Sequence, residues 1–508
     1  MVIKELRPCS NCPFTEHVTA LALADPAVQA QGSTAARLDY PGAQATFVRG
    51  IHNNGNGAVV GFYSSGGPHG FLLRNDSYMQ IDVPASWNAL GTNALGIADT
   101  SIKSTTYTLL DMGTLGRGSN SIPYWITESG EVVGVSETGQ TDSSGNAIVH
   151  AFRYKPGGMM EDLGTLGGNN STAFGANEEG KIVGVSDVTG GATSHAVSWH
   201  RDQITDLDTL VGSSGYSLAQ LLNNRGQAVG YSQAADGTFH AVEWDHGTIS
   251  DLGTLAGPNS MTFSLANGVN DRGQVVGDAQ QDTTTNPLLG FPPFFPTLWQ
   301  DGMAMKLGGE PSYAFAGDAF NINNRGQVVG RIAVAHPTEG AVAHAYIWDD
   351  GKMRDLGIPM GDDNSEAHSL NNKGIVVGDS GVGYILSYSP DRALLWDSRE
   401  AMPAPVDLNT LIPVNSGYQL IVAFAVNDEG QIVVCAVQLS TGNVHAALLT
   451  PHDRDNDEAF RAVTLSAPRA AIAEAIPSGA SHSLSPQAQR LLALSRRIKT
   501  GLGTAPAN

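Results

Sequence analysis

The 508-residue sequence predicts an all-β protein, a single β-propeller of about eight four-stranded blades followed by a short C-terminal helix. Three observations support this fold class. A segment ending in Val-Val-Gly recurs about every 50 residues, each unit offers four short apolar stretches, and the chain has 60 glycines but only 15% charged residues. Four short strands in a repeat of this length are typical of a propeller blade.

The recurring segment contains a turn that joins two strands. Its clearest copies are NNRGQAVG (223–230), NDRGQVVG (270–277), NNRGQVVG (323–330) and NNKGIVVG (371–378), and weaker copies begin at 54, 127, 177 and 427. Asn at the start and Gly three positions later predict a type I turn with positive φ at the Gly, in a tight hairpin with a bulge. The eight copies predict eight blades; seven is the alternative, if the first unit only completes another blade.

A second pattern follows each turn, His-Ala-x-x-aromatic and then Asp-Leu-x-Thr-Leu. HAVSW (195–199) precedes DLDTL (206–210), while FPTLW (295–299) and RALLW (392–396) depart from the pattern. A residue that recurs once per blade more often serves the blade than a ligand. We therefore expect the recurring histidines to bond Ser/Thr and Asp, as in WD-repeat blades, instead of holding a metal in the channel. The recurring tryptophans should pack between blades.

These motifs carry a family resemblance. The combination of DLGTLGG (162–168), INNRGQVVG (322–330) and HAYIW (344–348) resembles the HAF-repeat family, predicted extracellular repeat proteins of bacteria. The resemblance covers roughly residues 37–450. It implies a secreted β-propeller-like array located outside the cell or on its surface, with no assigned activity and no catalytic residues.

The chain is expected to have three parts. Residues 1–36 read as a poorly ordered leader or linker, 37–466 as the propeller, and 467–508 as an Ala/Ser/Pro-rich tail with a helix at about 486–500. Ser485 is a suitable N-cap before Pro486, and an apolar face predicts that this helix packs against the ring or a partner. Segments 38–42 and 460–466 are candidates for closing the ring.

Charge and cysteine content exclude several classes. The net charge of −21 disfavours nucleic acid and anionic membrane surfaces as partners. No run of about 18 apolar residues occurs, so the sequence predicts no transmembrane segment, and the N-terminus is too broken for a clear signal peptide. Three cysteines cannot form a disulfide framework. Cys9 and Cys12 have the spacing of a redox or zinc motif, but an incidental or inter-chain disulfide is favoured.

The sequence predicts no cofactor and no metal site, and it assigns no catalytic residue. Calcium is the alternative at HDRDND (452–457), where Asp453, Asp455 and Asp457 alternate, but the central Gly and closing Glu of a calcium loop are missing. GDSG (378–381) matches the string around the nucleophile of chymotrypsin-like proteases. Here it arises as the end of an ordinary repeat, so we do not expect a nucleophile.

Function in a repeat scaffold usually lies on insertions that belong to single units. The longest insertions are 280–295, 333–343 and 381–391, at equivalent positions of three consecutive units. They should gather on one face and give it an aromatic surface suited to a saccharide, a peptide or another small molecule. The candidate ligand-binding residues are Phe291, Phe294, Phe295, His336, His368, Tyr384 and Tyr388.

Two functions fit this arrangement. We favour a ligand-binding or interaction module; the alternative is an enzyme, such as a lyase, hydrolase or cyclase, with its active site at the propeller axis or under the 280–390 loops. A compact cluster of non-repeated titratable residues would favour the enzyme. An aromatic rim without such residues would favour binding.

Overall fold

The computed structural model describes most of the chain between residues 45 and 492. The described residues are 45–51, 59–64, 68–74, 77–81, 484–492, and 106–452 without 192, 258, 259, 310, 312, 388, 401 and 402. The chain divides into two compact units, Met1–Ser104 and Thr105–Asn508. Each unit is described by itself.

The first unit contains one antiparallel sheet with strand order β1-β2-β3-β4. Its strands are β1 (Ala45–Ile51), β2 (Val59–Ser64), β3 (Pro68–Arg74) and β4 (Ser77–Ile81). The last three residues of the first copy of the repeat, 59–61, lie in β2, so this sheet has four strands of its own.

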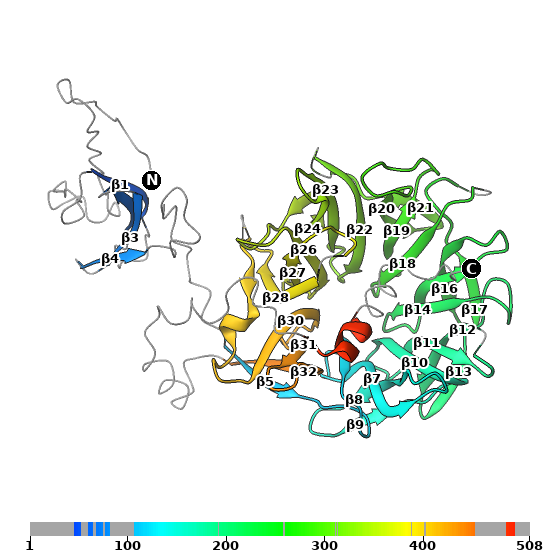
Figure 1. Cartoon of the computed structure of the whole chain (residues 1–508). Coiled ribbons are helices and arrows are strands. Elements are labelled where there is room, and N and C mark those ends of the chain that lie inside the picture. The colour runs from blue at the N-terminus through cyan, green and yellow to red at the C-terminus, as the bar shows by residue number, and fades with distance from the viewer. Residues whose placement is uncertain are drawn as a thin grey trace. The chain divides into compact units, whose positions relative to one another are not determined.

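The second unit is a propeller of seven four-stranded antiparallel sheets, drawn as a ring in Figure 1. Blades 1 to 3 consist of β6 (Ser121–Ile126), β7 (Val132–Thr141), β8 (Ala147–Tyr154), β9 (Met160–Asp162); β10 (Gly167–Ala176), β11 (Ile182–Val188), β12 (Ser194–His200), β13 (Gln203–Asp206); and β14 (Ser217–Leu222), β15 (Ala228–Gln233), β16 (Phe239–Asp245), β17 (Thr248–Asp251). Blades 4 to 6 consist of β18 (Ser264–Val269), β19 (Val275–Gln280), β20 (Phe294–Gln300), β21 (Met303–Lys306); β22 (Ala314–Ile322), β23 (Val328–His336), β24 (Gly340–Asp349), β25 (Lys352–Asp355); and β26 (Asn364–Leu370), β27 (Ile375–Val382), β28 (Ser389–Asp397), β29 (Val406–Asp407).

Blade 7 closes the ring with strands from both ends of the unit. Its first three strands are β30 (Tyr418–Val426), β31 (Ile432–Gln438) and β32 (Val444–His452), and β5 (Thr106–Asp111) pairs with β32 as the fourth. This closure leaves no open sheet edge between the first and last blades. The expected eight blades are therefore wrong and the alternative of seven is confirmed. Strand β5 closes the ring. The candidate segments 38–42 and 460–466 lie outside the described residues.

The predicted turns are confirmed in all seven blades. Their glycines, such as Gly226 and Gly326, have φ of 83° and 87°, a region that side chains other than Gly rarely adopt. The Gly226 N–H donates to the Asn223 carbonyl, and the Asn223 N–H donates to the Gln227 carbonyl, as in a type I turn followed by a bulge.

These turns also bond to one another around the ring, in what we call the turn belt. The backbone N–H of each second turn residue donates to a side-chain oxygen at the same position of the next blade, over 2.7 to 3.1 Å. The series runs through Glu128, Glu178, Asn224, Asp271, Asn324, Asn372 and Asp428, and returns to Glu128. The turn sequence Asn-Asn or Asn-Asp thus has a second role, since it links neighbouring blades.

The recurring histidines bond the recurring aspartates, as expected. The pairs are His150–Asp162, His195–Asp206, His240–Asp251, His344–Asp355 and His445–Asp111, each with Nδ1 at 2.7 to 2.8 Å from a carboxylate oxygen. In blade 3, burial raises the pKa of Asp251, but hydrogen bonds from His240 and the Gly253 N–H outweigh it and hold that pKa below its ordinary value. The His-Ala and Asp-Leu-Gly motifs therefore form one lock between the third and fourth strands of a blade.

Blade 4 replaces both members of this lock together. Phe295 occupies the histidine position and Lys306 the aspartate position, and the Lys306 ammonium lies 4.1 Å from the centre of the Phe295 ring. A cation over an aromatic face is attractive. The two departures from the repeat thus compensate each other.

Apolar contacts hold neighbouring blades together. Trp244 of blade 3 packs with Val183 and Ala196 of blade 2, and Trp199, Trp299 and Trp396 are also buried. This confirms that the tryptophans pack between blades. Burying a side chain of this size contributes about 2 to 3 kcal/mol.

A short helix (residues 486–492) packs inside the ring (Figure 1). The Ser485 hydroxyl accepts a hydrogen bond from the Ala488 N–H, which is the predicted N-cap, and the Ser485 N–H donates to Gly442 of blade 7. Ala488 and Leu491 are buried in a cluster with Ile122 and other residues near the axis. No helix in the described part of the chain is long and apolar enough to cross a membrane.

The double variant Phe295→His/Lys306→Asp should restore the lock in blade 4. Each single substitution removes the cation–ring contact without creating the His–Asp pair, so each should lower the midpoint of urea unfolding. The double variant should recover, with a coupling free energy of about 0.5 to 3 kcal/mol. Strictly additive effects would show that the two positions are independent.

Candidate functional site

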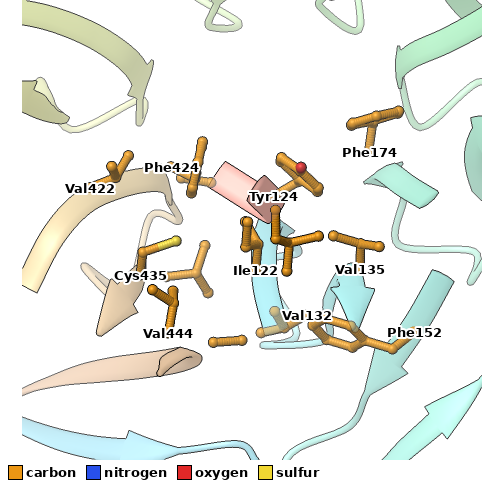
Figure 2. Close-up of a cluster of buried hydrophobic side chains, with 14 of the residues drawn as sticks. Ile122, Tyr124, Val132, Val135, Phe152, Phe174, Val422, Phe424, Cys435 and Val444 are labelled. Carbon is orange, nitrogen blue, oxygen red and sulfur yellow. The ribbon is translucent and has the colours of Figure 1, made fainter. Parts of the chain in front are cut away.

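The first strand of every blade carries the same bulge, and its extra residue lies next to the propeller axis. The bulge residues are Tyr124, Phe174, Gln220, Asn267, Phe320, His368 and Phe424, each three positions before the first turn residue. Adjacent rings are in contact: Phe320 with His368, His368 with Phe424, and Phe424 with Tyr124, at 5.3 to 5.6 Å between centres. Figure 2 shows Phe424 beside Tyr124 with apolar side chains around them. Side chains therefore fill the axis at this level.

A second layer of side chains lies on the same first strands, two residues before each bulge residue. Each residue of this layer pairs with the residue that follows the Val-Val-Gly position on the second strand of the blade. In blades 1, 2, 3 and 7 the pairs are Ile122–Val135, Thr172–Val185, Leu218–Tyr231 and Val422–Cys435. In blades 4, 5 and 6 they are Leu265–Asp278, Asp318–Arg331 and Glu366–Asp379. Charged groups thus replace apolar ones in three consecutive blades. With His368, these five charged residues are called the axial charged cluster.

The members of this cluster from blades 5 and 6 are bonded into one network. The Arg331 guanidinium donates from Nε to Asp318 and from Nη1 to Glu366 Oε1, the latter over 2.5 Å. His368 Nε2 lies 2.6 Å from Asp379 Oδ2 and 4.0 Å from Glu366 Oε2. Arg331, Glu366, His368 and Asp379 are all buried. The network therefore crosses from blade 5 to blade 6 beside the axis.

Blade 4 contributes Asp278, which is also buried. Burial and the neighbouring Asp318 carboxylate raise the pKa of Asp278 well above its ordinary value, against hydrogen bonds from Asn267 and the Ala319 N–H. Burial and the charges of Asp278 and Asp318 likewise raise the pKa of Tyr346, whose hydroxyl has no hydrogen-bond partner among the described residues. Asp278 and Tyr346 are therefore favoured in their neutral forms.

The cluster carries an excess of negative charge even when Asp278 is neutral. Asp318, Glu366 and Asp379 set three carboxylates against the one guanidinium of Arg331. Burying unbalanced charge costs several kcal/mol. Blades 1, 2, 3 and 7 have uncharged residues at the same positions, so these charges are not part of the repeat.

Above this cluster lie the three insertions, which meet as expected. The Tyr384 hydroxyl donates to the Leu288 carbonyl over 3.1 Å, the Ile385 N–H donates to the Ala341 carbonyl over 3.0 Å, and Leu289, Ala333 and Ile385 belong to one apolar cluster. We call 280–295, 333–343 and 381–391 together the loop cap. It joins blades 4, 5 and 6, the same blades that carry the charged residues.

A pocket of about 30 Å³ lies between the loop cap and the cluster. Its apolar walls include Leu289, Phe291, Phe294, Ile385 and Leu386, and Asp318 and Arg331 form its polar part. We call this the cap pocket. Near this pocket the loop cap exposes three apolar side chains, Leu288 (40% exposed), Val382 (52%) and Leu386 (38%). The surface around the pocket is therefore apolar, whereas Asp318 and Arg331 make its inner wall charged.

The predicted ligand-binding residues fall in different places. Phe291 and Phe294 line the cap pocket, Tyr384 holds the loop cap together, and His368 belongs to the axial charged cluster. Phe295 instead lines a separate small pocket with Lys306, and His336 Nδ1 accepts from the Glu339 N–H at the tip of the β23–β24 hairpin. Tyr388 and the calcium candidates Asp453, Asp455 and Asp457 lie outside the described residues.

Sequence reasoning missed Asp278, Asp318, Arg331, Glu366 and Asp379. Asp379 belongs to the GDSG string, where it is part of the charged network. A signal was present, because the five residues lie five positions before or eight after the first turn residue, where the other repeats of the ring have uncharged residues. Aligning the repeats on their turns would have exposed these departures.

A second acidic group lies in blade 6. Arg392, at the repeated histidine position, is 3.5 Å from Asp362 Oδ1 and 3.8 Å from Asp391 Oδ1. Burial, the Asp362 charge and other carboxylates raise the pKa of Asp391 to about 6, against the opposing effect of Arg392. This group gives blade 6 a carboxyl that titrates nearer neutral pH than an ordinary aspartate.

A polar mouth of about 120 Å³ lies at the turn face. The turns line it, including Glu128, Glu178 and Asp271. Side-chain oxygens of all three accept hydrogen bonds of the turn belt. We therefore place the candidate site at the opposite end, under the loop cap.

No family model and no curated protein sequence matches the chain. It is similar to YCF48 bound to D1 peptide (12% identity, 68% of this chain and 94% of that chain, TM-score 0.38). It is also similar to oligogalacturonate lyase from Vibrio parahaemolyticus (8% identity, 68% and 97%, TM-score 0.40). At these TM-scores the likenesses carry no argument about activity.

Arg331→Met should lower the free energy of unfolding by about 3 to 5 kcal/mol, because it leaves Asp318 and Glu366 without their shared guanidinium. Arg153→Met is the matched control, since the Arg153–Glu161 pair is partly exposed and should contribute less than about 1 kcal/mol. Both are measured by chemical unfolding at neutral pH. Equal losses in the two variants would contradict the network.

Proposed function

We propose that the protein is a ligand-binding or interaction module that captures its ligand on the loop cap. One polar group of the ligand enters the cap pocket and bonds to Asp318 and Arg331, while an apolar part rests on the exposed surface of the cap. The observation that carries this proposal is the coincidence, in blades 4 to 6 alone, of the three insertions and the axial charged residues.

The size of the pocket defines the ligand class. A volume of about 30 Å³ admits a head group of a few atoms, not a whole sugar ring. The apolar walls and the exposed Leu288, Val382 and Leu386 favour an aliphatic or aromatic body. A peptide side chain or a compact small molecule with one polar end matches this chemistry better than an oligosaccharide does.

Two further parts of the proposal rest on the sequence. The resemblance to the HAF-repeat family supports a place outside the cell or on the cell surface. The net charge of −21 over the whole chain supports a partner other than nucleic acid.

Enzymatic activity, as a lyase, hydrolase or cyclase, is the second candidate. Non-repeated titratable residues beside the axis favour it: Arg331, His368 and Asp379 lie within one network, and Asp391 has a pKa of about 6. A carboxyl with such a pKa can exchange protons near neutral pH. Binding remains the preferred function because the pocket holds only a head group.

A thermal-shift screen of short peptides, aromatic amines, carboxylates and oligosaccharides tests the proposal, with product analysis of every hit. Compounds with an apolar body and one polar end should raise the melting temperature. Phe294→Ala should weaken such a hit at least about tenfold. Phe295→Ala is the matched control and should change affinity little, because Phe295 lines a different pocket.

Equal effects of the two alanine variants, or a screen in which only oligosaccharides bind, would contradict the proposed site. Consumption of a hit would show an enzyme in place of a binding module.

A further inference from the structure

A metal-ligating set of side chains lies within the axial charged cluster. Glu366 and His368 on β26 and Asp379 on β27 each offer a ligand atom, and these atoms lie within 4.8 Å of one another. All three residues are buried. We propose that Glu366, His368 and Asp379 bind one divalent transition-metal ion, such as Zn²⁺ or Mn²⁺.

The geometry of Glu366 supports this assignment. Arg331 Nη1 holds Oε1 at 2.5 Å, while Oε2 lies on the side of His368, 4.0 Å from its Nε2. A ligating carboxylate is commonly oriented by an outer hydrogen bond to its other oxygen. Arg331, itself fixed by Asp318, can supply that outer bond.

His368 presents its Nε2 to both carboxylates. Its Nε2 bonds Asp379 Oδ2 over 2.6 Å, and its Nδ1 is buried without a hydrogen-bond partner among the described residues. Nε2 is therefore the imidazole nitrogen that would ligate the metal. A metal ion at Nε2 would take the place of the proton between His368 and Asp379 and release it to solvent.

Charge balance selects the ion. With a dication, the Glu366 and Asp379 carboxylates are neutralised, Asp318 and Arg331 neutralise each other, and His368 stays uncharged. The excess negative charge of the cluster then disappears. One imidazole and two carboxylates suit Zn²⁺ or Mn²⁺, whereas Ca²⁺ and Mg²⁺ prefer oxygen ligands alone.

The site would hold a metal with three protein ligands. Structural zinc sites usually have four, and catalytic ones usually have three with one open position. Arg331, which lines the cap pocket, bonds Glu366, so the open position would serve a ligand that enters from the loop cap. This last step rests on the proposed function; the metal site itself does not.

The test is a titration of the full chain, stripped with chelator and dialysed, with Zn²⁺ and with Mn²⁺ by calorimetry. We expect one ion per chain and a higher melting temperature. Glu366→Gln and His368→Asn should each weaken binding by more than about 100-fold. His240→Asn, which disrupts a His–Asp lock in blade 3, is the matched control and should bind normally.

Co²⁺ provides a measurement that needs no variant. The wild-type chain should bind one Co²⁺ and show visible absorption bands of a low-coordinate site with nitrogen and oxygen ligands, which Zn²⁺ abolishes. Absence of stoichiometric binding, or binding that survives both Glu366→Gln and His368→Asn, would overturn the metal site. Because no organic ligand is present, failure here is distinct from failure of the loop-cap screen.

Discussion

Closure of the ring is the constraint on which the rest of the structure depends. A blade buries its faces only against two neighbours, so the seventh sheet must meet the first, and β5 supplies the strand that fixes it there. The turn belt repeats the same closure in hydrogen bonds, from Glu128 through seven blades to Asp428 and back. The repeated residues accordingly serve the scaffold. The turn glycines allow the positive φ of the turns, the asparagines bond neighbouring turns, and the histidines form the locks between strands.

A scaffold stabilised by repeated contacts can tolerate, at a few places, residues that lower the stability of the fold. The axial layer shows this contrast, because Leu218 and Tyr231 of blade 3 occupy the positions that Asp318 and Arg331 occupy in blade 5. Buried charges of this kind seldom stabilise a fold more than well-packed apolar residues do. Their restriction to blades 4 to 6, under the loop cap, associates them with function.

Local chemistry explains what the sequence could predict. The Asn-to-Gly turns, the His–Asp pairing, the tryptophans between blades and the meeting of the insertions all follow from motifs with a direct physical meaning. Blade number did not follow, because counting turns cannot show that the first copy forms a sheet of its own while β5 completes blade 7. The contacts within the charged cluster did not follow either, because its residues meet only through the strand register and the bulge that brings His368 to the axis.

The central claim is that the axial charged cluster serves function and not the fold. It is tested by giving blades 5 and 6 the residues of blades 3 and 2: Asp318→Leu, Arg331→Tyr, Glu366→Thr, Asp379→Val and, from Phe174, His368→Phe. We predict that chemical unfolding of this variant gives a midpoint at or above that of the wild type, with metal and ligand binding lost. A variant less stable by several kcal/mol would show that the cluster holds the ring together, and would contradict the account.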